Sequence, residues 1–108
     1  MSHVTTHVLD AALGRPAVGI DVLLMDAGGV TIASGVTDTD GRIVDLGPEQ
    51  LPVGDFRLVF DTGDYFAALG VTAFYPMVTI DFTISDASAH YHVPVLLSPF
   101  AYSTYRGS

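Results

Sequence analysis

The stretch Met77-Val-Thr-Ile-Asp-Phe-Thr-Ile-Ser85 decides the fold class of this chain, because apolar and polar residues alternate along it. The apolar residues of one face are Val78, Ile80, Phe82 and Ile84. A period of two is typical of a β-strand that buries one face and leaves the other open. The stretch therefore predicts a strand whose second face remains free for solvent, a partner subunit or a binding site.

The same alternation recurs along the rest of the chain and is interrupted by turn signals. Further strands are predicted at residues 3–9, 20–25, 30–36, 43–46, 56–61 and 89–97. Glycine-containing turns are predicted at 26–29 and 40–41, and one short helix is predicted at 64–69 before Gly70. This pattern of about seven or eight short strands and at most one helix predicts an all-β fold, an antiparallel β-sandwich.

The composition indicates a single domain with more apolar material than its core needs. The chain has 108 residues, so one domain over 1–108 is expected, and 49% of the residues are hydrophobic. A domain of about 100 residues buries only about 60–70% of its unfolded surface. Since soluble monomers rarely expose large apolar patches, the surplus predicts a buried interface between subunits.

The charge balance excludes several classes of partner. The net charge is −8, lysine is absent, and the four basic residues are Arg15, Arg42, Arg57 and Arg106. Nucleic-acid and anionic-membrane surfaces need clustered basic residues, so neither partner is expected. The chain has no cysteine, no leader-like start and no apolar run of membrane-spanning length, and a cytoplasmic location is therefore expected.

The last residues, Tyr102-Ser-Thr-Tyr-Arg-Gly-Ser108, follow the apolar run Val93-Pro-Val-Leu-Leu-Ser-Pro-Phe100. This segment is dense in hydroxyls and aromatic rings and carries a guanidinium, so it is expected to line a site. The alternation also places His7 and His92 on outward faces of their strands, where a seam between subunits would form.

Each of these polar residues also has an ordinary structural interpretation. A lone histidine is usually a surface or hydrogen-bonded structural residue, and His3 and His90 are interpreted in that way. Arg42 follows a turn and could be a solvated charge. Histidines on two strands could suggest a metal site, but no acidic ligands accompany them at a fixed spacing, so no metal is expected. The residues alone thus predict an acidic, self-associating sandwich with a histidine and arginine site.

Several motifs resemble those of one known family, the transthyretin-like 5-hydroxyisourate hydrolases. They are Thr5-Thr-His-Val-Leu-Asp10, Gly14-Arg-Pro-Ala17, Thr37-Asp-Thr-Asp-Gly-Arg42, Phe74-Tyr-Pro76 and Tyr91-His-Val-Pro-Val-Leu-Leu-Ser-Pro-Phe-Ala-Tyr-Ser-Thr-Tyr-Arg-Gly-Ser108. The last motif is long and specific, whereas the turn motif alone is weak. Two positions depart from the family pattern: Val4 replaces a larger aliphatic residue and Ala101 replaces glycine.

The resemblance implies a transthyretin-like sandwich of two four-stranded sheets with one short helix, assembled as a homotetramer, a dimer of dimers. It implies hydrolysis of 5-hydroxyisourate in urate degradation by a cyclic amide hydrolase that uses no cofactor. The family's functional positions fall on His7, Arg42, His92, Tyr105, Arg106, Gly107 and Ser108. His7, Arg42, His92 and Ser108 would be catalytic, and His7, Arg42, Tyr105, Arg106 and Gly107 would bind substrate.

Two alternatives to this hydrolase remain. The first is a transthyretin-type carrier that binds small hydrophobic hormones without chemistry, because one fold can serve several functions. The polar set His7, Arg42 and His92 argues against that alternative, since it would be costly in a channel for apolar ligands. The second is a structural or adhesive module with no ligand.

Overall fold

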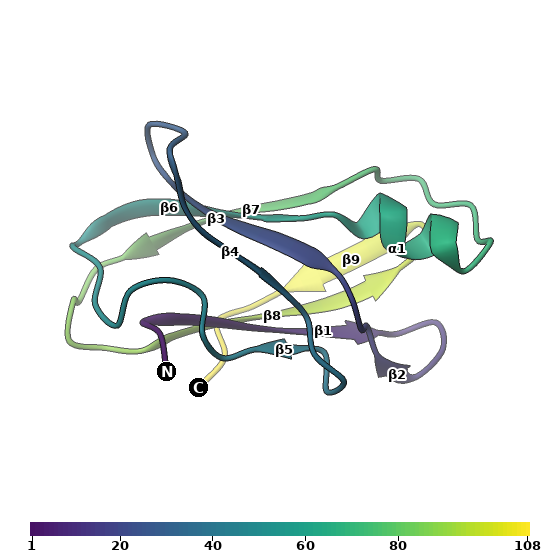
Figure 1. The fold of residues 1–108 in the computed structure, drawn as a ribbon, viewed down its shortest axis with the longest axis horizontal. Helices are drawn as coiled ribbons and strands as arrows, with labels where there is room; N and C mark the ends of the chain where they lie inside the picture. Colours follow the sequence, from purple (N-terminus) through teal and green to yellow (C-terminus); the bar gives the residue numbers. More distant parts are fainter.

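Two β-sheets that share one core, together with one short helix, make up the structure of this chain (Figure 1). It is a computed structural model that describes residues 1–108. The first sheet has the order β2-β1-β8-β9, and a fifth strand, β5, also pairs with β1. Its strands are β1 (Val4–Asp10), β2 (Arg15–Pro16), β5 (Arg42–Ile43), β8 (Tyr91–Ser98) and β9 (Ala101–Thr104).

The second sheet has four strands in the order β4-β3-β6-β7. Its strands are β3 (Asp21–Asp26), β4 (Thr31–Val36), β6 (Gly54–Phe60) and β7 (Val78–Ile84), and the helix α1 (Thr62–Ala68) follows β6. The alternation predicted for β7 is confirmed, because Val78, Ile80 and Ile84 are buried in the core that both sheets share. α1 has seven residues and is the single helix of the structure, and a helix of this length is too short to cross a membrane.

The all-β sandwich is confirmed, but its first sheet is mixed rather than wholly antiparallel. β1 and β8 run parallel from the pair Val4 and Tyr91 to the pair Asp10 and Leu97, whereas every other pairing is antiparallel. Alternation reports which face of a strand is buried and carries no information on strand direction. The parallel pair places the two histidine-bearing strands side by side at the centre of this sheet.

The final strand, β9, was not among the expected strands. All four of its residues are exposed, so no alternation marks it, and it is held by antiparallel pairing with β8. Ala101 occupies its first position, and no residue other than glycine has a positive φ angle. Alanine therefore fits the backbone at the position where the family pattern has glycine.

Candidate active site

The site begins with the register of three neighbouring strands, β5, β1 and β8. His7 on β1 lies opposite Arg42 on β5, and Thr5 on β1 lies opposite His92 on β8. Because residues two apart on a strand share a face, Thr5 and His7 present their side chains on the same side of β1. The register thus brings together one arginine and two histidines that are far apart in the sequence.

A tight turn fixes the position of Arg42. Gly41 has a φ angle of 75°, and a Cβ at this position would collide with the carbonyl oxygen of Val8. The Asp38 carboxylate accepts hydrogen bonds from the backbone N–H groups of Asp40 and Arg42, both at 2.9 Å. The bond from the Arg42 N–H holds the pKa of Asp38 below its ordinary value. The turn predicted at 40–41 therefore places Arg42 beside β1, opposite His7.

The last residues of the sequence pack against His92. The Gly107 N–H donates to the His92 carbonyl oxygen at 2.9 Å, in an isolated antiparallel bridge. A Cβ at Gly107 would lie 2.6 Å from Cδ2 of His92 and 3.1 Å from Cγ of Pro94. Only glycine allows this approach, and the next residue, Ser108, lines the same cavity as His92.

A cavity of about 250 Å³ opens at this point, and its walls include Thr5, Arg42, His90, His92 and Ser108. Three sequence-predicted site residues, Arg42, His92 and Ser108, therefore line one cavity. His7 is not part of this lining, but it pairs in the register with Arg42, which is. The lining combines a guanidinium, imidazoles and hydroxyls, a set that can bind an anion, accept a proton and orient water.

The environment of His92 favours a neutral imidazole. Desolvation by burial lowers its pKa below the ordinary 6.5, and the nearby Arg42, His7 and His90 lower it further. Each of these neighbours carries or can carry positive charge, which opposes protonation of His92. At neutral pH the ring is therefore unprotonated on one nitrogen, the state that a general base requires.

Tyr105 and Arg106 lie on another side of His92. Together with His92 they line a second hollow of about 300 Å³, next to Ile80 and Phe82 of β7. The Arg106 guanidinium lies 4.3 Å from the centre of the Tyr91 ring, in a cation–π contact. In this single chain, the predicted residues thus divide between two hollows, and His92 lines both.

The structural interpretation of His3 is confirmed, although the residue is buried rather than close to a loose end. Its Nε2 lies 2.6 Å from the Ala89 carbonyl oxygen, and its Nδ1 accepts from the Leu51 N–H at 2.8 Å. Both ring nitrogens are therefore satisfied within the protein. His90, interpreted in the same way, instead lies 2.9 Å from the Thr5 hydroxyl inside the candidate site. The sequence offered one signal for this contact: His90 and His92 are two residues apart, so they share a face of the strand predicted at 89–97.

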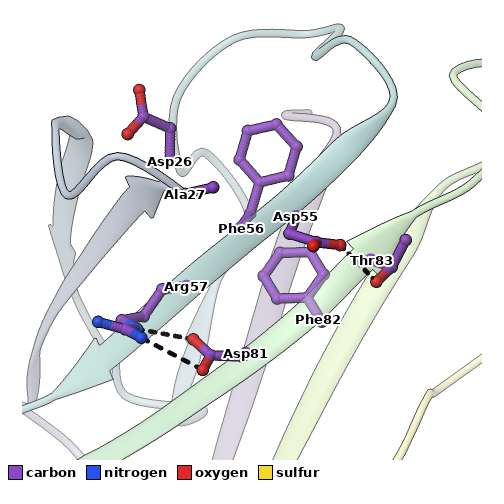
Figure 2. A pocket seen from close by; sticks show the side chains of 8 residues that line it. All are labelled: Asp26, Ala27, Asp55, Phe56, Arg57, Asp81, Phe82 and Thr83. Carbon is purple, nitrogen blue, oxygen red and sulfur yellow. Dashed lines mark hydrogen bonds and ion pairs between the residues drawn. The ribbon is translucent and has the colours of Figure 1, made fainter.

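Another hollow, of about 290 Å³, lies at the far sheet, and Figure 2 shows its lining on β6 and β7. Its charged groups already have partners: Arg57 donates to Asp81 at 2.6 and 3.3 Å, and Thr83 donates to Asp55 at 2.7 Å. Asp26, at the end of β3, accepts from the Gly28 and Val30 N–H groups, both at 2.9 Å. None of the sequence-predicted site residues lines it. Across residues 1–108, moreover, no group of three or more histidine, aspartate or glutamate side chains is placed to hold a metal ion.

Comparisons with known proteins point to a single family. The profile of the HIUase/Transthyretin family matches residues 4–107. A 5-hydroxyisourate hydrolase from Caulobacter vibrioides is 45% identical, and the match covers 100% of each chain. The solved Klebsiella pneumoniae 5-hydroxyisourate hydrolase has a TM-score of 0.89 at 41% identity and covers 97% of this chain and 98% of its own. Sea bream transthyretin in complex with thyroxine has a TM-score of 0.90 at 35% identity, covering 96% of this chain and 93% of its own.

Proposed function

Since this chain belongs to the HIUase/transthyretin family, we infer that it hydrolyses 5-hydroxyisourate, the product of urate oxidation. Water attacks a ring carbonyl and the six-membered ring opens, which gives 2-oxo-4-hydroxy-4-carboxy-5-ureidoimidazoline. The observation that carries this conclusion is the cavity shared by Arg42, His92 and Ser108, with His7 opposite Arg42. A base beside a fixed cation suits the attack of water on an electron-poor carbonyl.

His92 takes the proton from the attacking water in this proposal. Its lowered pKa keeps the ring neutral at physiological pH, so that a ring nitrogen is free to accept. A positioned general base contributes about 10²- to 10⁴-fold to such a reaction. His7 orients the water or returns the proton to the ring nitrogen that leaves.

Arg42 stabilises the negative charge that develops on the carbonyl oxygen during attack. Its backbone is fixed by Asp38 and by pairing with β1, so the guanidinium is carried by a rigid element. Removing a donor of this kind commonly reduces the rate by about 10²- to 10³-fold. Arginine also suits the planar, oxygen-rich edge of the substrate, because it presents several donors in one plane.

The residues 105–108 complete the site in this proposal. Tyr105 offers a ring against which the purine-like substrate can stack, and Ser108 offers a hydroxyl inside the cavity of His92. Arg106 anchors the segment through its contact with Tyr91, and Gly107 allows the close approach to His92. Ser108 is assigned to positioning of water rather than to nucleophilic attack.

The reaction is hydrolysis of a cyclic amide and needs no cofactor in this proposal. Water is the only second reactant and no electrons are transferred. The charge that develops in the transition state falls on a carbonyl oxygen, which a guanidinium can stabilise. We place the reaction in the cytoplasm, where the sequence predicts the chain to reside.

We further propose that the functional form is a homotetramer, a dimer of dimers. The edge strands β7 and β9 border one hollow, so both sheets present an unpaired edge on the same side of the sandwich. Next to this edge, the exposed Phe74, Tyr75 and Tyr102 form a continuous aromatic contact, with ring centres 4.9 and 5.2 Å apart. On the outer face of the first sheet, Leu96 is 39% exposed on the same strand as His92. Pairing across the edges and packing across this face would bury both apolar surfaces.

A spectrophotometric assay tests the proposed reaction. 5-Hydroxyisourate is generated freshly from urate, the protein is added, and the decay of the ultraviolet band is compared with the spontaneous decay. We expect a marked acceleration, and a loss of at least about a hundredfold in kcat for His92→Ala. If the native protein leaves the spontaneous rate unchanged, the proposed function is wrong; if His92→Ala keeps the native rate, the role of His92 is wrong.

A further inference from the structure

A single hydroxyl connects two imidazoles in the candidate site. The Thr5 Oγ1 atom lies 2.7 Å from Nδ1 of His92 and 2.9 Å from Nε2 of His90. Thr5 is buried, with only 5% of its surface exposed, so water does not compete freely for this hydroxyl. His92 is the second residue of β8, His90 lies directly before that strand, and Thr5 comes from the parallel strand β1 beside it.

The number of hydrogens restricts how these three groups can bond. A threonine hydroxyl has one hydrogen to donate and two lone pairs that accept, so it cannot donate to both rings. At least one ring must therefore donate to Thr5. If His92 donates from Nδ1, its Nε2 carries no hydrogen and is free to accept a proton. If Thr5 donates to Nδ1 instead, the hydrogen of the neutral ring is on Nε2, and that nitrogen cannot act as a base.

We propose that Thr5 is a positioning residue for His92: its hydroxyl accepts the Nδ1 hydrogen of His92 and donates its own hydrogen to Nε2 of His90. This arrangement leaves Nε2 of His92 as the free nitrogen. His90 acts as the acceptor at the end of the chain of hydrogen bonds, with no contact to the reacting atoms. The inference rests on the proposed function, because only a general base needs this tautomer.

His90 is suited to that role by its surroundings. It is exposed, and it lines both the cavity of His92 and a neighbouring open hollow with His3 and Glu49. Its second nitrogen can therefore carry a hydrogen towards solvent while Nε2 accepts from Thr5. The titratable or charged groups near His92 are Arg42 from β5, His7 from β1 and His90 from the segment directly before β8.

The tautomer can be measured without substrate. In protein labelled with ¹⁵N at the histidine rings, NMR distinguishes a ring nitrogen that carries hydrogen from one that does not. We expect the neutral His92 ring to carry hydrogen on Nδ1 in the native protein and to shift towards Nε2 in Thr5→Val. A native ring with hydrogen on Nε2, or a tautomer unchanged in Thr5→Val, would overturn the proposal.

Kinetic variants give the second measurement. We expect Thr5→Val to reduce kcat by about tenfold or more, because a base held in the wrong tautomer cannot accept the proton. Thr5→Ser keeps the hydroxyl and should restore most of the rate. His90→Phe removes the acceptor and should lower kcat in the same direction, without a matching change in KM.

Another buried threonine provides a matched control. Thr37 is 2% exposed, its hydroxyl donates to the Ala17 carbonyl oxygen at 2.7 Å, and it lines none of the hollows described above. Thr37→Val therefore removes a buried hydrogen bond away from His92, and its kcat should stay near the native value once folding is confirmed by circular dichroism.

The outcomes separate this proposal from the proposed function. Equal losses in Thr5→Val and Thr37→Val, or a Thr5→Ser variant as slow as Thr5→Val, would reduce Thr5 to a structural role. A protein with the expected His92 tautomer but no activity on 5-hydroxyisourate would contradict the proposed function, while the hydrogen-bond arrangement would stand.

Discussion

Glycine at position 107 sets how closely the final segment approaches the His92 imidazole. An added methyl group would lie 2.6 Å from the His92 ring, so the segment or the ring must move in a Gly107→Ala variant. Displacements of about 1 Å in an active site can reduce the rate by about a hundredfold. We expect kcat/KM to fall by at least about tenfold, with little change in Tm because the segment is largely exposed.

A second glycine serves as the control for this substitution. At Gly28, in the turn between β3 and β4, an added Cβ would be 3.4 Å from its nearest neighbour, a normal contact. Gly28→Ala should therefore leave kcat/KM near the native value. Equal activity of the two variants would show that the approach to His92 tolerates a side chain.

The charge of Arg42 also acts on His92 through its pKa. A positive neighbour makes the protonated imidazole less favourable, so Arg42 contributes to the lowered pKa of His92, after the larger effect of burial. We expect the pKa of His92 to rise in Arg42→Gln while staying below 6.5, because burial remains. An NMR titration of the His92 ring measures this change, and a fall in the pKa would contradict it.

The individual site residues could be predicted from the sequence only where a local signal marks them. Arg42 follows a glycine turn, and the outward position of His92 follows from alternation. The bond between Thr5 and His90 could not be predicted, because it joins residues 85 positions apart through a strand pairing that no local pattern encodes. The same holds for Arg106, whose contact with Tyr91 depends on the path of the whole segment.

At the scale of elements, α1 is attached to the first sheet through Tyr65. Its hydroxyl donates to Oδ2 of Asp10 at 2.7 Å, and Asp10 at the end of β1 is almost completely buried. Removing the donor in Tyr65→Phe leaves that carboxylate short of a hydrogen bond. We expect a loss of about 1–2 kcal/mol in the free energy of unfolding, measured with urea at pH 7. An unchanged midpoint would show that water replaces the hydroxyl fully.

Tyr65 also makes the free energy of unfolding decrease as the pH rises in the alkaline range. Burial is the main cause that raises the pKa of Tyr65 from 10.0 to about 12, and the hydrogen bond to Asp10 adds to it. Between these values the unfolded chain releases a proton that the folded protein keeps, so the free energy of unfolding falls as the pH rises. We expect Tyr65→Phe to lose part of this alkaline slope, measured by urea unfolding at several pH values; an identical slope would contradict the assignment.

The elements that could be predicted are those with one buried face. β7 alternates clearly, and its predicted bounds differ from those observed by one residue at each end. β9 has four exposed residues and pairs through its backbone with β8, so no alternation of buried and exposed side chains marks it. β5 is shorter than expected because Arg42–Ile43 pairs only with the stretch of β1 around His7.

At the scale of the whole molecule, the outer face of the first sheet carries both the surface proposed for self-association and the residues proposed for catalysis. Leu96 is exposed on this face and lies opposite the half-buried Leu9 of β1, two residues from His7. A lysine in this apolar patch would have to be desolvated in an assembly that covers it. We expect Leu96→Lys to reduce the assembled fraction in sedimentation experiments and to lower kcat/KM with it.

Leu69, at the end of α1, offers a matched control, because its 40% exposure is nearly that of Leu96 at 39%. Leu69→Lys should sediment like the native protein. If both variants sediment like the native protein, the outer face of the first sheet does not take part in self-association.

The parallel pairing of β1 with β8 has a consequence for synthesis of the protein. It joins residues 87 positions apart, so the first of these strands leaves the ribosome long before its partner is translated. A nascent chain that has been synthesised as far as β7 contains every strand of the second sheet. In the first sheet, β1 still lacks its neighbour β8. Such late closure of a central strand pair is slow, because a long loop must be ordered first. The proposed site, which needs both β1 and β8, therefore forms only after every strand of the second sheet has been synthesised.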